Sequence, residues 1–271
     1  QKPEMLELAA MEVDQAEYYF SIEQYSEGVE HYLKAKKLGL NYNSTAYKQL
    51  TSTANKMLEK KEYKSAEELY LLSERVSRNI SESAHTIAEK YFEREIFKTA
   101  STWYQKAVDH GNKAATFRLA YSYNEIGKYD SAIRYDKEAN ENSEWAGTLH
   151  NLSRVYMVGK NDCNNAITYA RKANALENKY GSFELGYCHE ALGRYKSAIK
   201  YYKADIKVNP DSPDAFWNMA FIYGNGKGDV DKNENISCNM FLSAARLGNK
   251  EAMNATAICY REGLLGTGIN I

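Results

Sequence analysis

Proline and net charge are both scarce in this chain of 271 residues. It has only three prolines, Pro3, Pro210 and Pro213, so helices can run through most of the sequence without the break that proline imposes. Its 35 lysines and arginines almost balance its 36 aspartates and glutamates, which leaves a formal net charge of -1. Because a near-neutral chain has no long-range field that attracts a phosphate backbone, nucleic acid is not an expected partner.

Long apolar runs are absent as well. No segment approaches the roughly 20 consecutive apolar residues that a membrane helix needs, so no membrane span is expected in this chain. No charged-then-apolar signal segment opens the sequence, which starts at Gln1. We therefore expect a soluble chain, either cytoplasmic or exported after removal of an upstream segment.

The residue types that carry catalysis and metal binding are few and scattered. The four cysteines, Cys163, Cys188, Cys238 and Cys259, include no pair at metal-ligand or redox spacing, so buried free thiols are expected. The five histidines lie far apart and have no neighbouring residues that would activate them. The sequence thus predicts no enzyme, no cofactor and no metal site.

What the chain does have is a short recurring pattern. An aromatic residue is followed three positions later by a tiny residue and usually, four further on, by a second aromatic residue. The copies are Tyr25, Gly28 and Tyr32; Tyr63, Ala66 and Tyr70; Phe97, Ala100 and Tyr104; Tyr129 and Ala132, with Tyr135 one place early; a degenerate copy at Tyr156, Ala166 and Tyr169; and Tyr195, Ala198 and Tyr202. Their period of about 34 residues predicts stacked helical hairpins.

The segments between the turns are rich in alanine, leucine, glutamate, lysine and tyrosine, and strand-like alternation is absent. The fold class is therefore predicted to be all-α, with about seven antiparallel hairpins in a single repeat array over residues 1–271. The hairpins are expected near residues 5–40, 46–78, 80–112, 113–144, 146–178, 180–211 and 213–248, with a terminal helix over 251–262.

This layout resembles the tetratricopeptide repeat family, abbreviated TPR. The best match runs from Leu185-Gly186 through Gly193-Arg194-Tyr195 and Ala198 to Asn209-Pro210, although Asp205 stands where that family has a small residue. The segments 106–115 and 243–252 look more like the related Sel1-like repeats. The resemblance implies a right-handed superhelical solenoid. Within it, Gly39, Gly111 and Gly248 are expected to end helices in a left-handed conformation.

In the resembled family the first helices of the hairpins line a concave wall, and a ligand segment usually lies along it. Aligning the copies places four pairs of residues at corresponding positions of successive first helices: Phe117 and Tyr121, His150 and Arg154, Phe183 and Tyr187, and Trp217 and Phe221. The earlier copies have Val13 and Glu17, Thr51 and Asn55, and His85 and Glu89 at these positions. Rings that face the groove would suit a peptide or an amphipathic helix. The alternative is that these rings only pack between adjacent first helices.

The expected function is a non-enzymatic scaffold that binds a peptide or helix of a partner protein in its concave groove. The alternatives are an RNA-binding helical repeat and the sensor or docking region of a larger regulatory protein. Because the predicted last helix has no hairpin partner in this sequence, self-association through the C-terminal end is a further hypothesis. The apolar residues at that end are Met253, Ala257, Ile258, Leu264, Leu265 and Ile269.

Overall fold

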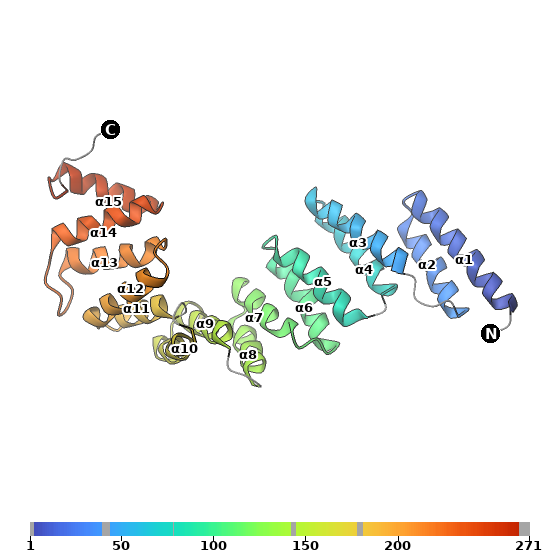
Figure 1. Ribbon diagram of the computed structural model, residues 1–271, viewed down its shortest axis with the longest axis horizontal. Coiled ribbons are helices and arrows are strands. Elements are labelled where there is room, and N and C mark those ends of the chain that lie inside the picture. The colour runs from blue at the N-terminus through green and yellow to red at the C-terminus, as the bar shows by residue number, and fades with distance from the viewer. Residues whose placement is uncertain (1–2, 40–43, 78, 142–144, 178–180, 266–271) are drawn as a thin grey trace. The chain divides into compact units, whose positions relative to one another are not determined.

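The computed structural model describes residues 3–39, 44–77, 79–141, 145–177 and 181–265, and it is all-α over these ranges (Figure 1). The described residues form fifteen α-helices, and the ninth continues into one π-helical turn, η1 (Val155–Gly159). The α-helices are α1 (Pro3–Ser21), α2 (Tyr25–Lys37), α3 (Ser44–Glu59), α4 (Tyr63–Arg75), α5 (Ile80–Phe92), α6 (Phe97–Asp109), α7 (Ala115–Glu125), α8 (Tyr129–Asn140), α9 (Ala146–Arg154), α10 (Cys163–Leu176), α11 (Ser182–Ala191), α12 (Tyr195–Val208), α13 (Pro213–Asn225), α14 (Glu234–Arg246) and α15 (Lys250–Arg261).

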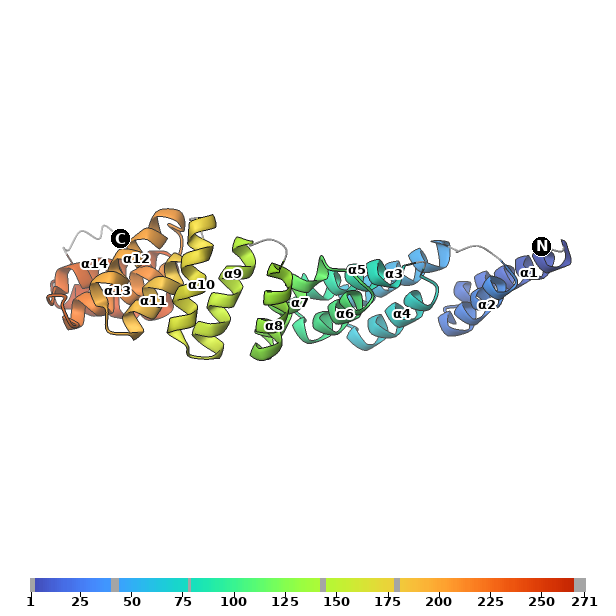
Figure 2. The same ribbon diagram turned by 90° about the horizontal axis from the view of Figure 1, so that it is seen from below.

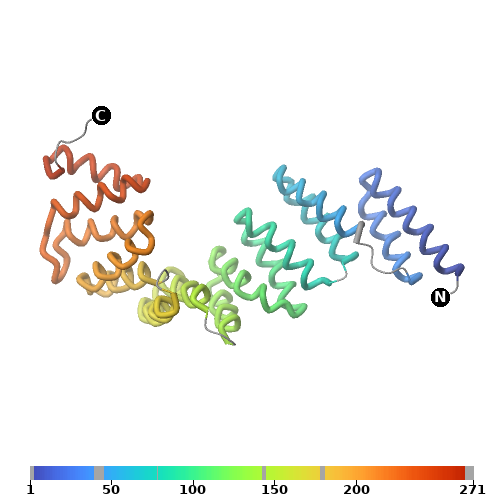
Figure 3. The backbone as a smooth tube through the Cα atoms, in the orientation of Figure 1, coloured from blue at the N-terminus to red at the C-terminus, as the bar shows by residue number. Residues whose placement is uncertain are grey.

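Contacts between residues group the chain into two compact units, Gln1–Ser122 and Tyr123–Ile271. In the first unit the helices pair as the hairpins α1–α2, α3–α4 and α5–α6, and in the second as α9–α10, α11–α12 and α13–α14, followed by α15 (Figure 2). The backbone trace shows the same alternation of helix and short turn within each unit (Figure 3). The prediction of an all-α fold built from helical hairpins is therefore confirmed.

The tiny residues of the repeating pattern lie where the two helices of a hairpin cross. Ala66, Ala100 and Ala198 are completely buried. At Gly28 a β-carbon would overlap the ring of Phe20, and at Gly186 it would lie 2.6 Å from the ring of Tyr202. Larger side chains at these positions would push the helices apart, which explains why the pattern requires small residues.

The second aromatic residue of the pattern ties the second helix of a hairpin to the first. Tyr70 and Tyr104 are buried, and their hydroxyl groups each donate a hydrogen bond of 2.5 Å, to Asn55 and to Glu89 respectively. Burial raises the pKa of Tyr70 to about 12, so its hydroxyl group remains a hydrogen-bond donor at neutral pH. The residues that recur with the repeat period therefore make the contacts between the two helices of a hairpin.

The three glycines expected to end helices do so. Gly39, Gly111 and Gly248 have φ angles of 100°, 91° and 93°, which only glycine adopts readily. Each follows the last turn of a second helix, α2, α6 or α14, and its backbone N–H donates to a carbonyl group of that turn. The chain can therefore leave one hairpin and begin the next within a few residues.

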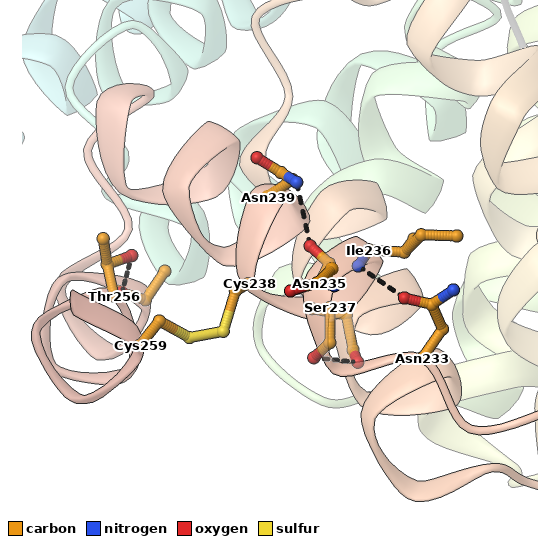
Figure 4. Close-up of a disulfide and its surroundings, with 10 residues drawn as sticks. Asn233, Asn235, Ile236, Ser237, Cys238, Asn239, Thr256 and Cys259 are labelled. Carbon is orange, nitrogen blue, oxygen red and sulfur yellow. Dashed lines mark hydrogen bonds between the residues drawn. A yellow bond between two sulfur atoms is a disulfide. The ribbon is translucent and has the colours of Figure 1, made fainter. Parts of the chain in front are cut away.

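The expectation of free thiols is wrong for two of the four cysteines. Cys238 of α14 and Cys259 of α15 form a disulfide, with their Cα atoms 5.8 Å apart (Figure 4). Cys163 and Cys188 are free, and Cys188 is buried. The bonded cysteines lie 21 residues apart in the sequence, but consecutive helices place them side by side. This tertiary contact has no signature in the spacing of the cysteines.

The C-terminal end combines covered and exposed apolar side chains. Leu265 is buried and lies in a cluster with the disulfide, whereas Met253 and Ile258 of α15 are exposed. Ile269 lies outside the described residues. Self-association through this end stays a prediction. Over the described part of the chain, every helix is too short or too polar to cross a membrane.

Candidate protein-binding surface

The first helices of the second unit carry exposed aromatic rings. Tyr187 of α11 retains 44% of its accessible surface and Phe221 of α13 retains 38%. They occupy corresponding positions of two successive first helices, so the two rings lie one repeat apart. Exposed rings at such positions are available to a partner without any rearrangement of the hairpins.

The other two predicted aromatic residues of these helices are half-buried and support the exposed ones. The ring of Phe183 lies 5.7 Å from that of Tyr202 in the same hairpin and packs against the core of the second unit. Trp217 lies 5.3 Å from Phe241 of α14, and Phe221 lies 4.7 Å from Trp217. Phe183 and Trp217 thus contribute to hairpin packing. Phe221 also packs against Trp217 and Phe241 but keeps part of its ring exposed, as Tyr187 does.

The predicted pair on α9 makes ionic contacts with its neighbours. His150 lies 3.0 Å from Glu184 of α11, and Arg154 lies 3.9 Å from Glu125. Burial alone would raise the pKa of Glu184, but its hydrogen bond to His150, together with the charges of His150 and Arg154, lowers that pKa below its ordinary value. The His150–Glu184 contact therefore joins two successive first helices through an ionised carboxylate.

A polar network that the sequence did not reveal lies on α11, α12 and α13. The hydroxyl of Tyr202 donates to Glu190 at 2.9 Å and accepts from the side-chain amide of Asn218 at 3.1 Å. Lys227 lies 3.7 Å from the other oxygen of Glu190. The repeating pattern could have indicated this network. Tyr70 and Tyr104 occupy the same position of the pattern as Tyr202, and each donates a hydrogen bond to a polar side chain of a first helix.

The remaining predicted pair, Phe117 and Tyr121, belongs to α7 and lies in the first unit. Both side chains are half-buried. The ring of Tyr121 packs 5.4 Å from that of Phe92 of α5. The guanidinium group of Arg118 lies 4.4 Å from the centre of the same Phe92 ring. The ring of Tyr121 therefore supports the packing of α5 and α7 within the first unit.

A metal site requires several ligating side chains close together. Among the described residues, no group of three or more histidine, cysteine, aspartate or glutamate side chains could hold a metal ion. The side chains that stand out in the second unit are instead the exposed rings of Tyr187 and Phe221. Helical hairpins that recur about every 34 residues define a helical-repeat fold.

Comparison with known proteins gives a family match for one segment of the chain. Residues 179–212 match the family model of the tetratricopeptide repeat. A TPR repeat-containing protein of Methanocaldococcus jannaschii is 31% identical over 156 residues, which are 54% of this chain and 26% of that protein. One segment of the chain thus matches the tetratricopeptide repeat, and the chain spans about a quarter of the length of this curated relative.

Two solved structures have a similar fold. YrrB, described as a TPR protein with an unusual peptide-binding site, has a TM-score of 0.51 at 18% identity, covering 69% of this chain and 97% of its own. PilF of Pseudomonas aeruginosa has a TM-score of 0.56 at 15% identity, covering 79% of this chain and 98% of its own. At these identities the likeness concerns the fold alone. The Sel1-like character of residues 106–115 and 243–252 stays a prediction.

Proposed function

We propose that this protein is a non-enzymatic scaffold whose second unit binds a peptide or a helix of a partner protein along α9, α11 and α13. The observation that carries the proposal is the exposure of Tyr187 and Phe221 on successive first helices. Rigid aromatic side chains lose little conformational entropy when they bind, and they dominate the energetics of many protein interfaces.

The charged residues beside these rings would orient the bound segment. His150 and Arg154 lie on α9, Glu190 lies on α11, and Lys227, which follows α13, lies 3.7 Å from Glu190. A suitable partner segment would place one apolar side chain against Tyr187 and another against Phe221, with polar groups between them that face the charged residues. Such a segment can be extended or helical, since both forms place side chains at regular intervals along one face.

The test starts from a random peptide library displayed on phage and selected on the immobilised full chain. Peptides enriched in this way are then labelled, and their binding to the full chain is measured by fluorescence anisotropy. We expect the double variant Tyr187→Ser/Phe221→Ser to weaken binding at least about tenfold, because two interface rings each contribute roughly 1 kcal/mol or more.

The matched control is Tyr18→Ser, which removes a tyrosine that is 58% exposed on α1 in the first unit. This variant should bind the selected peptides as the wild type does, and circular dichroism should show native helicity for both variants. The proposed surface is wrong if the selected peptides bind the double variant with wild-type affinity, or if selection enriches no peptide.

A further inference from the structure

The first unit contains a groove of about 420 Å³ between its first two hairpins. The floor of this groove is apolar and is formed by Met57 of α3 and by Leu69 and Leu72 of α4. Its opposite wall is the start of α2, where Tyr25 adds an aromatic ring. The groove is therefore lined by side chains that are able to contact an aliphatic group.

The rim of the groove is acidic. Glu23 and Glu27, at the start of α2, and Glu68 of α4 line it, and all three are exposed. Within the described part of the chain, none of these three carboxylates forms an ion pair, although several other glutamates do. Three such carboxylates around an apolar floor favour a ligand that is both basic and apolar.

The next junction in the same unit, between the hairpins α3–α4 and α5–α6, shows that this groove is not a general property of the repeat. There the positions of Met57 and Leu69 are occupied by Tyr91 and Trp103, which are both buried. The position of Leu72 is occupied by Lys106, which bonds to Glu74. Larger side chains and an ion pair thus fill the space that is open at the first junction.

The charges differ between the two junctions in the same way. Lys61 stands where the first junction has Glu23, Ser65 where it has Glu27, and Thr102 where it has Glu68. The connection also differs in length, because residues 38–43 separate α2 from α3 whereas residues 76–79 separate α4 from α5. The open floor and the acidic rim therefore coincide at one place in the first unit.

We propose that this groove docks a segment of a partner protein in which lysine or arginine residues flank an aliphatic side chain. The aliphatic side chain would lie on Met57, Leu69 and Leu72, and the cations would face Glu23, Glu27 and Glu68. This site is separate from the aromatic surface of the second unit and goes beyond the function proposed for that surface. It gives the chain a second point of attachment with its own chemical preference.

The probe for this proposal is a fluorescein-labelled decapeptide in which lysine alternates with leucine, measured by anisotropy against the full chain. We expect saturable binding below about 1 mM that weakens as salt is added, because salt screens exposed charges. A peptide with glutamate in place of lysine, or with serine in place of leucine, should bind at least about tenfold more weakly.

Two variants locate the binding site. Glu27→Gln/Glu68→Gln removes two rim charges and should weaken binding about tenfold, as expected for two exposed charge contacts. Met57→Tyr/Leu69→Trp introduces the side chains of the second junction and should abolish binding by filling the floor. The matched control, Glu138→Gln/Glu141→Gln, removes two exposed glutamates of the second unit and should change nothing.

The proposal is overturned if the lysine–leucine peptide fails to bind, or if it binds Glu27→Gln/Glu68→Gln and the control equally. Preference for the lysine–serine peptide would also overturn it, because charge alone would then account for binding. The variant Tyr187→Ser/Phe221→Ser should bind this peptide as the wild type does. Failure of the aromatic surface and failure of this groove are therefore distinguishable.

Discussion

At the scale of single residues, Asp136 departs most clearly from the repeat. It occupies the position in α8 that Tyr104 and Tyr202 hold in α6 and α12, and it is completely buried. One of its oxygens accepts a hydrogen bond of 2.5 Å from Asn151, and the other has no hydrogen-bond partner among the described residues. Burial raises the pKa of this carboxyl group to about 8, so it is protonated at neutral pH.

This raised pKa predicts a pH dependence of stability. In the unfolded chain Asp136 ionises near its ordinary pKa of 3.8, whereas in the folded chain it keeps its proton up to about pH 8. Folding then takes up a proton between these values, so the free energy of unfolding falls as the pH rises from about 4 to 8, by up to about 1.4 kcal/mol per pH unit. Asp136→Asn should remove this contribution.

The measurement is urea unfolding of the wild type and the variant at several pH values between about 4 and 8. The difference between the two curves isolates Asp136, because all other titrating groups are shared. The control is Asp211→Asn, which changes an exposed aspartate and should preserve the wild-type slope. Parallel curves for wild type and Asp136→Asn would show that the buried carboxyl group is ionised in the folded chain.

Residue-scale features were only partly predictable from the sequence. Tyr135, one place early, marks the break in the pattern, and its ring stacks 5.7 Å from that of Tyr123. The bond between Asp136 and Asn151 was not predictable, because periodicity gives the face of a residue but not its partner. His150 and Glu184 had a usable signal, since two side chains able to bond to each other lie one repeat apart on successive first helices.

At the scale of helices, the disulfide fixes the last element of the chain. Cys238 and Cys259 join α14 to α15, the last helix among the described residues. Closing a loop of this length stabilises a folded segment by about 3 kcal/mol in the chain-entropy model. The double variant Cys238→Ser/Cys259→Ser should therefore lose protection of α14 and α15 against hydrogen exchange.

The comparison is made by mass spectrometry of exchanged peptides from the full chain. Cys163→Ser removes a free, half-buried thiol and serves as the control, so α14 and α15 should keep their protection in it. In both variants the helices α11 and α12 should exchange as in the wild type, because each hairpin depends mainly on its neighbours. Unchanged protection of α15 without the disulfide would mean that packing alone holds this helix.

The positions of the helices were predictable because local signals agree with the period. α5 begins after Asn79, α14 after Asn233 and α15 after Asn249, and each of these asparagines accepts a hydrogen bond from a backbone N–H of the first turn. These caps agree with the all-α fold of helical hairpins that the sequence predicts. The disulfide and the groove beside Leu69 depend on which residues meet in space, and the period carries no such information.

At the scale of the whole molecule, the sequence predicts one array over residues 1–271, and the contacts group the chain into two compact units. Stability in a repeat protein is approximately a sum of the stabilities of the repeats and of their nearest-neighbour interfaces. Damage to one hairpin should then spread to its neighbours and weaken with distance along the chain. The two units offer matched positions at which this expectation can be examined.

Ala66 in α4 and Ala198 in α12 are both completely buried at helix crossings. Arginine at either position overpacks the crossing and buries a charge, which should cost more than about 3 kcal/mol. We expect Ala66→Arg to increase hydrogen exchange throughout α3–α6 and to leave α11–α13 as in the wild type. We expect Ala198→Arg to increase exchange throughout α11–α13 and to leave α3–α6 as in the wild type. Ala10→Arg, at an exposed position of α1, should alter neither region. Loss of protection in both units from either substitution would mean instead that the chain unfolds as one cooperative array.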